Sequence, residues 1–165
     1  MEGGKAFYAK YQNICVLKLV GKIRYTLTAD IDHFLTMLFR RNDFENMLID
    51  LTETKYIDST NLGLLAKAAK FMQQKFNKKI TIIAAFEGII EILNTVGFDN
   101  IFLLITKTEP FEEDLKELPH INLSERETAK MILEAHRHLM ELNAKNKTVF
   151  KDIVELLEKE INKIH

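Results

Sequence analysis

The polar cluster Asp58-Ser59-Thr60 stands between a short apolar run and a long helical pattern. Asp, Ser and Thr are all favoured as helix N-caps, because their side-chain oxygens accept hydrogen bonds from the free N–H groups of the first turn. A hydroxyl at this place also faces the positive end of the helix dipole. The cluster therefore has two interpretations: a helix cap with no further role, or a site that accepts an anion.

The second interpretation is phosphorylation of Ser59. Backbone donors and the helix dipole favour the added charge of about −1.5 to −2. A partner protein packed over the same spot would have to desolvate or repel that charge, and every ~1.4 kcal/mol changes its affinity tenfold. Phosphorylation of Ser59 would then switch binding while leaving the fold intact.

The other chemistry-bearing residues do not form a catalytic or metal-binding pattern. His136 and His138 are separated by roughly 200° around a predicted helix, so they cannot share a metal ion as an i, i+4 pair would. We expect them to be solvated or interfacial, and Cys15 to be a small core residue in a strand. No set of the six glycines gives GxGxxG, and the Gly21-Lys22 pair lacks the other features of a P-loop. We therefore expect no enzyme activity, no metal and no cofactor.

The stretch around Ser59 resembles the signature of STAS domains, the bacterial anti-sigma-factor antagonists. The family pattern is a strand, Asp-Leu-Ser/Thr, a short loop, and Asp-Ser-Ser/Thr-Gly-Leu-Gly at the start of a helix. The Gly97-Phe98 pair also resembles the family's ending of its third helix, and the order of elements agrees over about residues 5–117. The residues that carry the main resemblance are Asp50-Leu51-Thr52 and Tyr56-Ile57-Asp58-Ser59-Thr60-Asn61-Leu62-Gly63-Leu64-Leu65.

The resemblance implies a protein that binds an anti-sigma factor when unphosphorylated and releases it when phosphorylated. Ser59 matches the serine that a partner kinase modifies and a phosphatase restores, with Asp58 as the acidic neighbour needed for recognition. Thr60 is the secondary candidate for modification. Leu64 matches part of the helix segment that bears on the partner or packs below the site. We expect the partner-binding residues to be Asp58, Ser59, Thr60, Asn61, Leu62, Gly63 and Lys67.

Two positions depart from the family pattern. Asn61 replaces the usual glycine after the two hydroxyls, and we expect the turn to survive, because Asn tolerates left-handed and capping conformations. The segment Gly21-Lys22-Ile23-Arg24 lacks the acid that many antagonists carry, which would change the charge of the partner surface.

The elements that must position Ser59 form a repeated βα pattern, which predicts a mixed α/β sheet with helices mainly on one face and the first strand at an edge. Gly21 is expected to end the second strand, Thr26 or Thr28 to cap the first helix, and residues 52–58 to form a loop. The expected strands are Ala6–Tyr11, Ile14–Val20, Met47–Leu51, Ile80–Ala85 and Ile101–Ile105. The expected helices are Ala29–Arg41, Ser59–Phe76, Gly88–Val96 and a turn or two within Glu109–Leu118.

A helical extension is predicted after Pro119, so the chain divides into a STAS domain (1–118) and an extension (119–165). Ser124 and Glu127 form a capping-box pattern, and Asn143–Asn146 suggests a reversal between two helices. Two such helices bury too little to be stable alone, so they fold back on the domain or pair with another copy in a homodimer. The expected apolar stripes are Ile132, Ala135, Leu139 and Leu142 in the first helix, and Val149, Ile153, Leu156, Leu157, Ile161 and Ile164 in the second.

Composition limits the remaining functions. The 165 residues carry 23 Lys and Arg against 24 Asp and Glu, so no overall field favours nucleic acid or an anionic membrane. A single cysteine, no signal peptide and no long apolar run favour a cytoplasmic location. Lysines 67, 70, 75, 78 and 79 are either a solvated face or a patch that steers an acidic partner. A scaffold role in a signalling complex and binding of a small ligand stay open as alternatives to the antagonist.

Overall fold

A mixed sheet forms the centre of the protein. The computed structural model describes residues 3–41, 43–107, 109 and 114–164. The strands run in the order β6-β5-β3-β2-β1-β7, and β4 pairs with β2 beside this path. They are β1 (Lys5–Tyr11), β2 (Ile14–Ile23), β3 (Asn46–Leu51), β4 (Thr54–Ile57), β5 (Ile80–Ala84), β6 (Phe102–Thr106) and β7 (Lys116–Glu117).

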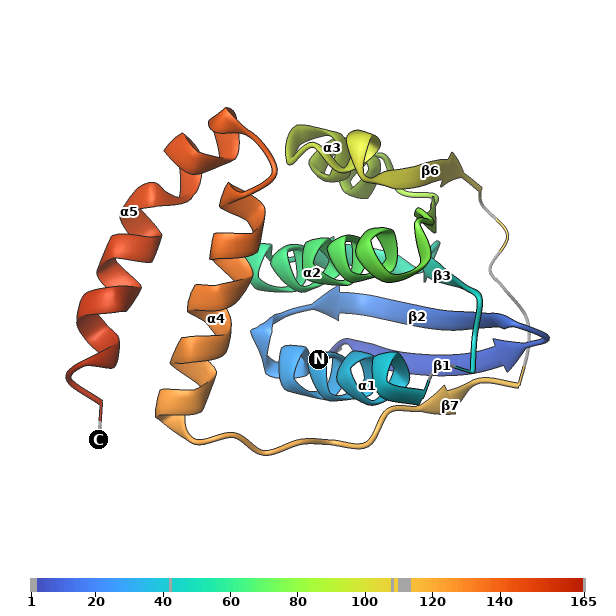
Figure 1. The fold of residues 1–165 in the computed structure, drawn as a ribbon, viewed down its shortest axis with the longest axis horizontal. Helices are drawn as coiled ribbons and strands as arrows, with labels where there is room; N and C mark the ends of the chain where they lie inside the picture. Colours follow the sequence, from blue (N-terminus) through green and yellow to red (C-terminus); the bar gives the residue numbers. More distant parts are fainter. Residues whose placement is uncertain (1–2, 42, 108, 110–113, 165) are drawn as a thin grey trace.

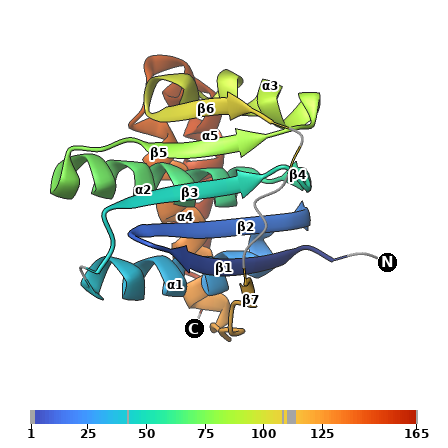
Figure 2. The same ribbon diagram turned by 90° about the vertical axis from the view of Figure 1, so that its right-hand side faces the viewer.

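Helices connect and cover these strands (Figure 1). Seen from the sheet side, the strands lie in front of α2, α4 and α5 (Figure 2). Short 3₁₀ turns at Tyr25–Leu27 and Phe98–Asn100 precede α1 and β6. The helices are α1 (Thr28–Arg41), α2 (Ser59–Phe76), α3 (Glu87–Thr95), α4 (Glu125–Met140) and α5 (Ala144–Ile161).

Strand directions follow from the connections. β1 and β2 are an antiparallel hairpin, whereas the β2–β3, β3–β5 and β5–β6 pairs are parallel and joined through helices. The inner strands are buried; Leu17, Ile49 and Ile82 have no exposed surface. Cys15 belongs to the same core, as predicted. The mixed α/β fold predicted from the βα pattern is confirmed.

Several boundaries differ from those predicted. β2 does not end at Gly21 but continues to Ile23 through a register shift, because Gly21 adopts a positive φ of 86° that glycine tolerates. Residues 54–57, predicted as loop, form β4 parallel to the end of β2. β1 is not the edge strand, since β7 pairs with its outer side.

Other boundary errors lie at helix ends. Neither Thr26 nor Thr28 caps α1, because the chain enters it through the 3₁₀ turn. The helix predicted within Glu109–Leu118 is wrong where the structure describes that segment, since Lys116–Glu117 is a strand; residues 110–113 lie outside the described part. Asn143 is the N-cap of α5, so Asn146 belongs to the helix and not to the reversal.

The C-terminal hairpin, defined as α4, α5 and the turn between them, folds back on the domain. α4 begins with the predicted capping box: the Glu127 N–H donates to the Ser124 hydroxyl oxygen, and the Ser124 N–H donates to the Glu127 carboxylate. Leu139 is fully buried in the main core, where Leu142 and Phe150 pack beside it. A smaller cluster of Leu133, Val154 and Ile161 lies between α4 and α5.

The stripe predicted for α5 is only partly correct. Val149, Ile153 and Leu156 face outward, with 59%, 38% and 53% of their surface exposed. Val154, which was not part of that stripe, is buried instead. The helix thus packs on α4 through a face rotated from the predicted one. Among the described residues, none of the helices has the length and apolar character needed to cross a membrane.

Candidate functional site at the start of α2

Strand β4 ends two residues before Ser59 and positions it at the end of the sheet. Thr54 donates its hydroxyl to the Leu19 carbonyl at 2.7 Å, and the Asp58 N–H donates to the Ile23 carbonyl at 3.0 Å. The Asp58 carboxylate then accepts from the Asn61 N–H at 2.9 Å and caps α2. Because Asp58 is the cap, the hydroxyl of Ser59 is left for another partner.

Asn61 ties this cap to α1. Its side-chain amide donates to Asp58 at 3.0 Å, and its side-chain oxygen accepts from the Thr28 hydroxyl at 3.0 Å. Asn61 is 1% exposed and lies within regular helix. Among the described residues, the positive-φ residues other than glycine are Gln12 and Asn77. The turn survives the departure from the family pattern, as predicted, through side-chain hydrogen bonds instead of a left-handed backbone.

The Ser59 hydroxyl contacts the C-terminal hairpin. Its oxygen lies 2.7 Å from Nε2 of His136, a buried side chain on α4. Nδ1 of His136 lies 2.7 Å from the Ile132 carbonyl oxygen. The ring packs edge-on against Phe150, with 5.6 Å between the two ring centroids. A carbonyl only accepts, so Nδ1 carries a proton, and in the neutral ring Nε2 accepts a hydrogen bond from the Ser59 hydroxyl. Ser59 itself is half-buried.

The next turn of α2 is covered by α4. Thr60, Leu62 and Gly63 are all buried. A Cβ on Gly63 would lie 2.0 Å from the backbone oxygen of Ala135, so only glycine permits this approach of the two helices. Of the predicted partner-binding residues, Thr60, Asn61, Leu62 and Gly63 are therefore buried, and Gly63 is the one that lies directly against α4. Asp58 and Ser59 stay half-buried.

A cleft of about 590 Å³ opens beside Ser59, between the start of α2, helix α3 and the start of α5. Its walls are mainly apolar and include Ile92 of α3 and Phe150 of α5. Two cations, Lys55 and Lys145, also line it. The Ser59 hydroxyl is thus at the boundary between the hairpin and an open, partly cationic cleft.

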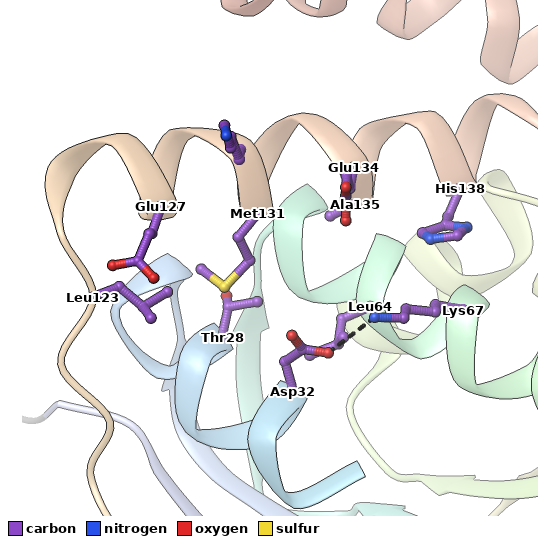
Figure 3. A pocket seen from close by; sticks show the side chains of 11 residues that line it. Thr28, Asp32, Leu64, Lys67, Leu123, Glu127, Met131, Glu134, Ala135 and His138 are labelled. Atoms are coloured by element: carbon purple, nitrogen blue, oxygen red, sulfur yellow. Dashed lines mark hydrogen bonds and ion pairs between the residues drawn. The ribbon is translucent and has the colours of Figure 1, made fainter. Parts of the chain in front are cut away.

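Further along α2, basic residues bond within the molecule. Lys67 pairs with Asp32 of α1 at 3.2 Å, in a pocket of about 280 Å³ between α1, α2 and α4 (Figure 3). Lys70 pairs with Glu141 at 2.9 Å and holds the pKa of that carboxyl below its usual range. Lys75 donates to the Phe39 carbonyl. Three of the five lysines of the predicted basic face are therefore engaged by the protein itself.

The two histidines of α4 occupy different surroundings. His136 faces Ser59, whereas His138 lies between the pocket of Figure 3 and a second hollow near Lys70. Burial, reinforced by Lys67 and Lys70, lowers the pKa of His138. Within the described part of the chain, no three His, Cys, Asp or Glu side chains converge as metal ligands.

The roles of two contributors to the site were not predicted from the sequence. His136 follows Ile132 by four residues, so the apolar stripe of α4 already places it on the packed face. Asn146 is buried and donates to the carbonyls of Val96 and Leu139, both at 2.9 Å, which fixes the hairpin to the end of α3. No sequence pattern distinguishes Asn146 from a surface residue of α5.

Comparisons with known proteins identify the family of the sheet domain. The family model described as STAS domain matches residues 8–118, which is most of the chain. The chain therefore belongs to the STAS domain family. No curated protein sequence matches it.

Solved structures share the fold at low sequence identity. An anti-sigma factor antagonist from Mycobacterium paratuberculosis is 15% identical, with a TM-score of 0.55 over 62% of this chain and 85% of the other. The Bacillus cell fate determinant SpoIIAA in its phosphorylated form is 11% identical, with a TM-score of 0.52 over 62% and 90%. The anti-sigma factor antagonist SpoIIAA in its unphosphorylated form is 10% identical, with a TM-score of 0.52 over 62% of this chain and 87% of the other. The family match ends at residue 118, before the C-terminal hairpin.

Proposed function

We propose that this chain is an anti-sigma-factor antagonist whose binding to its partner is switched by reversible phosphorylation of Ser59. The observation that carries the proposal is the place of the Ser59 hydroxyl. It lies in the first turn of α2 and borders an open cleft, and it is not used as a helix cap because Asp58 has that role. Thr60 is 5% exposed, which favours Ser59 over its neighbour as the modified residue.

The chemistry is supplied by a serine kinase and a phosphatase. The kinase transfers the γ-phosphoryl group of a nucleoside triphosphate to the Ser59 oxygen; the nucleoside diphosphate leaves and the hydroxyl proton passes to a base of the kinase. The phosphatase hydrolyses the ester with water and restores the hydroxyl. The start of α2 tolerates the added charge because its N–H groups and dipole favour an anion.

The partner is an anti-sigma factor that docks over the start of α2. An unmodified Ser59 presents a neutral hydroxyl to such a partner, whereas a phosphate adds a charge that the interface must desolvate. The protein would act in the bacterial cytoplasm, and its buried, unpaired Cys15 suits a reducing compartment.

Paired baits test this proposal in the native cell. Ser59→Ala is expected to capture an anti-sigma factor constitutively, and Ser59→Asp to lose about tenfold or more of that capture, since a tenfold loss needs only ~1.4 kcal/mol. Captured proteins are quantified by mass spectrometry. Peptides from the wild-type protein are also examined for phosphate on Ser59.

Circular dichroism and melting temperature serve as controls, because both variants should keep the fold and neither should melt below the wild type by more than a few degrees. Equal capture of the anti-sigma factor by Ser59→Asp and Ser59→Ala would contradict the switch. Absence of any anti-sigma factor from the Ser59→Ala capture would contradict the partner.

A further inference from the structure

The C-terminal hairpin lies on the surface that the proposed partner would use. Three contacts follow one face of α2 at intervals of about one to two turns: Ser59 with His136, Gly63 with Ala135, and Lys70 with Glu141. Ser59 and Gly63 are four residues apart, so they lie above one another on the helix. A protein that docks on this face of α2 must first displace α4.

The hydrogen bonding of His136 depends on whether Ser59 is modified. Its Nδ1 bonds to the Ile132 carbonyl, which leaves only Nε2 for Ser59. With 4% of its surface exposed, His136 has little access to water as a substitute partner. The hydrogen bond to Ser59 is therefore the one that satisfies Nε2 and helps to fix α4 on α2.

Phosphorylation of Ser59 would change Nε2 of His136 from a hydrogen-bond acceptor to a donor. The hydroxyl proton is replaced by the phosphoryl group, so Ser59 can no longer donate to Nε2. An adjacent phosphate favours the doubly protonated imidazolium, whose Nε2–H then donates to a phosphate oxygen. Such a charge-assisted bond is stronger than the neutral bond that it replaces.

The surroundings of Ser59 can receive the phosphate. The cleft of about 590 Å³ beside the hydroxyl provides room, and Lys55 of β4 and Lys145 of α5 line it. Asp58 is the acidic residue among those lining the cleft, and its carboxylate already accepts two hydrogen bonds from Asn61. The cations outnumber the acid, and one of them belongs to the hairpin.

We propose that the C-terminal hairpin is a built-in receptor for the phosphate on Ser59, with His136 as the residue that binds it. In the unmodified protein, the partner competes with α4 for this face of α2 and has only the neutral Ser59–His136 bond to displace at Ser59. In the phosphorylated protein, the phosphate bonds to the His136 imidazolium, attracts Lys145, and closes the hairpin over α2. The inference rests on the proposed function for its biological meaning and gives that switch an internal competitor for the partner.

The test uses the purified full chain with phosphoserine genetically encoded at position 59, and needs neither kinase nor partner. Amide hydrogen exchange is measured across α4 and α5 in the modified and unmodified chains. We expect about tenfold slower exchange in α4 when Ser59 carries phosphate. The ¹⁵N resonance of His136 Nε2 should move toward that of a protonated nitrogen when Ser59 carries phosphate.

His136→Gln and His138→Gln are the matched variants. The first substitution keeps a hydrogen-bonding side chain but removes the positive charge, so the gain in protection should disappear in that variant. His138 lies on the same helix without contacting Ser59, so His138→Gln should keep the gain. Faster exchange in phosphorylated wild type, no change, or a gain that survives His136→Gln would each overturn the inference.

Failure of this test and failure of the proposed function are distinguishable. Bait capture that depends on Ser59, combined with unchanged exchange in α4, would retain the switch and show that the phosphate acts directly on the partner. Slower exchange without any captured anti-sigma factor would retain the hairpin receptor and remove the partner.

Discussion

At the start of α2, neighbouring side chains have different hydrogen-bonding roles. The Asp58 carboxylate accepts a hydrogen bond from the Asn61 N–H, and the Asn61 side-chain oxygen accepts one from the Thr28 hydroxyl in α1. Ser59, between them in sequence, takes no part in capping and turns its hydroxyl to His136. A modification of Ser59 therefore leaves the cap intact, which is the physical condition for a switch that does not unfold its own helix.

The thiol of Cys15 gives a prediction at the same scale. Burial in the sheet raises the pKa of Cys15 to about 12, and nearby Asp43 adds to the effect. At pH 8 its thiolate fraction is then roughly a thousandfold below that of an ordinary thiol, and the thiolate is the reactive form. The native protein should react with a disulfide reagent at least about a hundredfold more slowly than the same protein in denaturant. Comparable rates in the two states would contradict the buried placement.

Residue types could be predicted at the site more easily than residue contacts. The strand–Asp-Leu-Thr–Asp-Ser-Thr pattern places Ser59 at the beginning of a helix, and α2 has the predicted limits Ser59–Phe76. The pairing with His136 spans 77 positions along the chain, and its two partners stand in different structural units. Local spacing carries no information on such a contact, although the stripe of α4 could have shown that His136 is packed.

At the scale of elements, the crossing of α2 and α4 depends on one glycine. Gly63→Ala would place a Cβ 2.0 Å from the Ala135 carbonyl oxygen, so the two helices must separate. We expect a loss of about 1–3 kcal/mol in unfolding free energy, as for other overpacked contacts. Amide exchange in α4 should also become faster, because the hairpin is the part that can move away.

Gly88→Ala is the matched control for this substitution. Gly88 also lies in a helix, but an added Cβ would meet nothing within 4 Å. Denaturant unfolding should show no loss for Gly88→Ala, since removing a glycine reduces the entropy of the unfolded chain. If Gly63→Ala were as stable as Gly88→Ala, the close packing of α2 and α4 would be refuted.

The elements themselves were predictable where an apolar pattern was clear. The inner strands follow short apolar runs, and both C-terminal helices follow longer stripes with helical spacing. β4 was missed because its four residues contain Lys55 and Tyr56 on its exposed positions, and it is stabilised by pairing with the end of β2. The face of α5 was misjudged because Val149, Ile153 and Leu156 have the spacing of a packed stripe yet point outward. Burial in both cases is decided by tertiary neighbours.

At the scale of the whole molecule, the hairpin and the STAS domain share one core, because Leu139, Leu142 and Phe150 pack with the residues between sheet and helices. His138 lies in this shared region, and among the described residues its buried Nδ1 has no hydrogen-bond partner. The carboxylate of Glu141 is 3.9 Å away. Protonation of His138 therefore affects the attachment of the hairpin to the rest of the protein.

The direction of the pH effect follows from the lowered pKa of His138. Burial, with Lys67 and Lys70, disfavours the charged ring in the folded protein and outweighs the opposing attraction of Glu141. Between the lowered pKa and the ordinary value of 6.5, the unfolded chain binds more protons than the folded one. This site consequently has no effect on stability above pH 6.5 and destabilises the protein as the pH falls below it.

Thermal and denaturant unfolding at pH 7.5 and 5.5 test this effect. The wild type should lose up to about 1.4 kcal/mol per pH unit at this site, whereas His138→Gln, which cannot be protonated, should lose less over the same interval. His33→Gln removes an exposed histidine of α1 and serves as the control substitution. An equal loss in wild type and His138→Gln would show that the acid sensitivity arises elsewhere, and that the contact between hairpin and domain is indifferent to this ring.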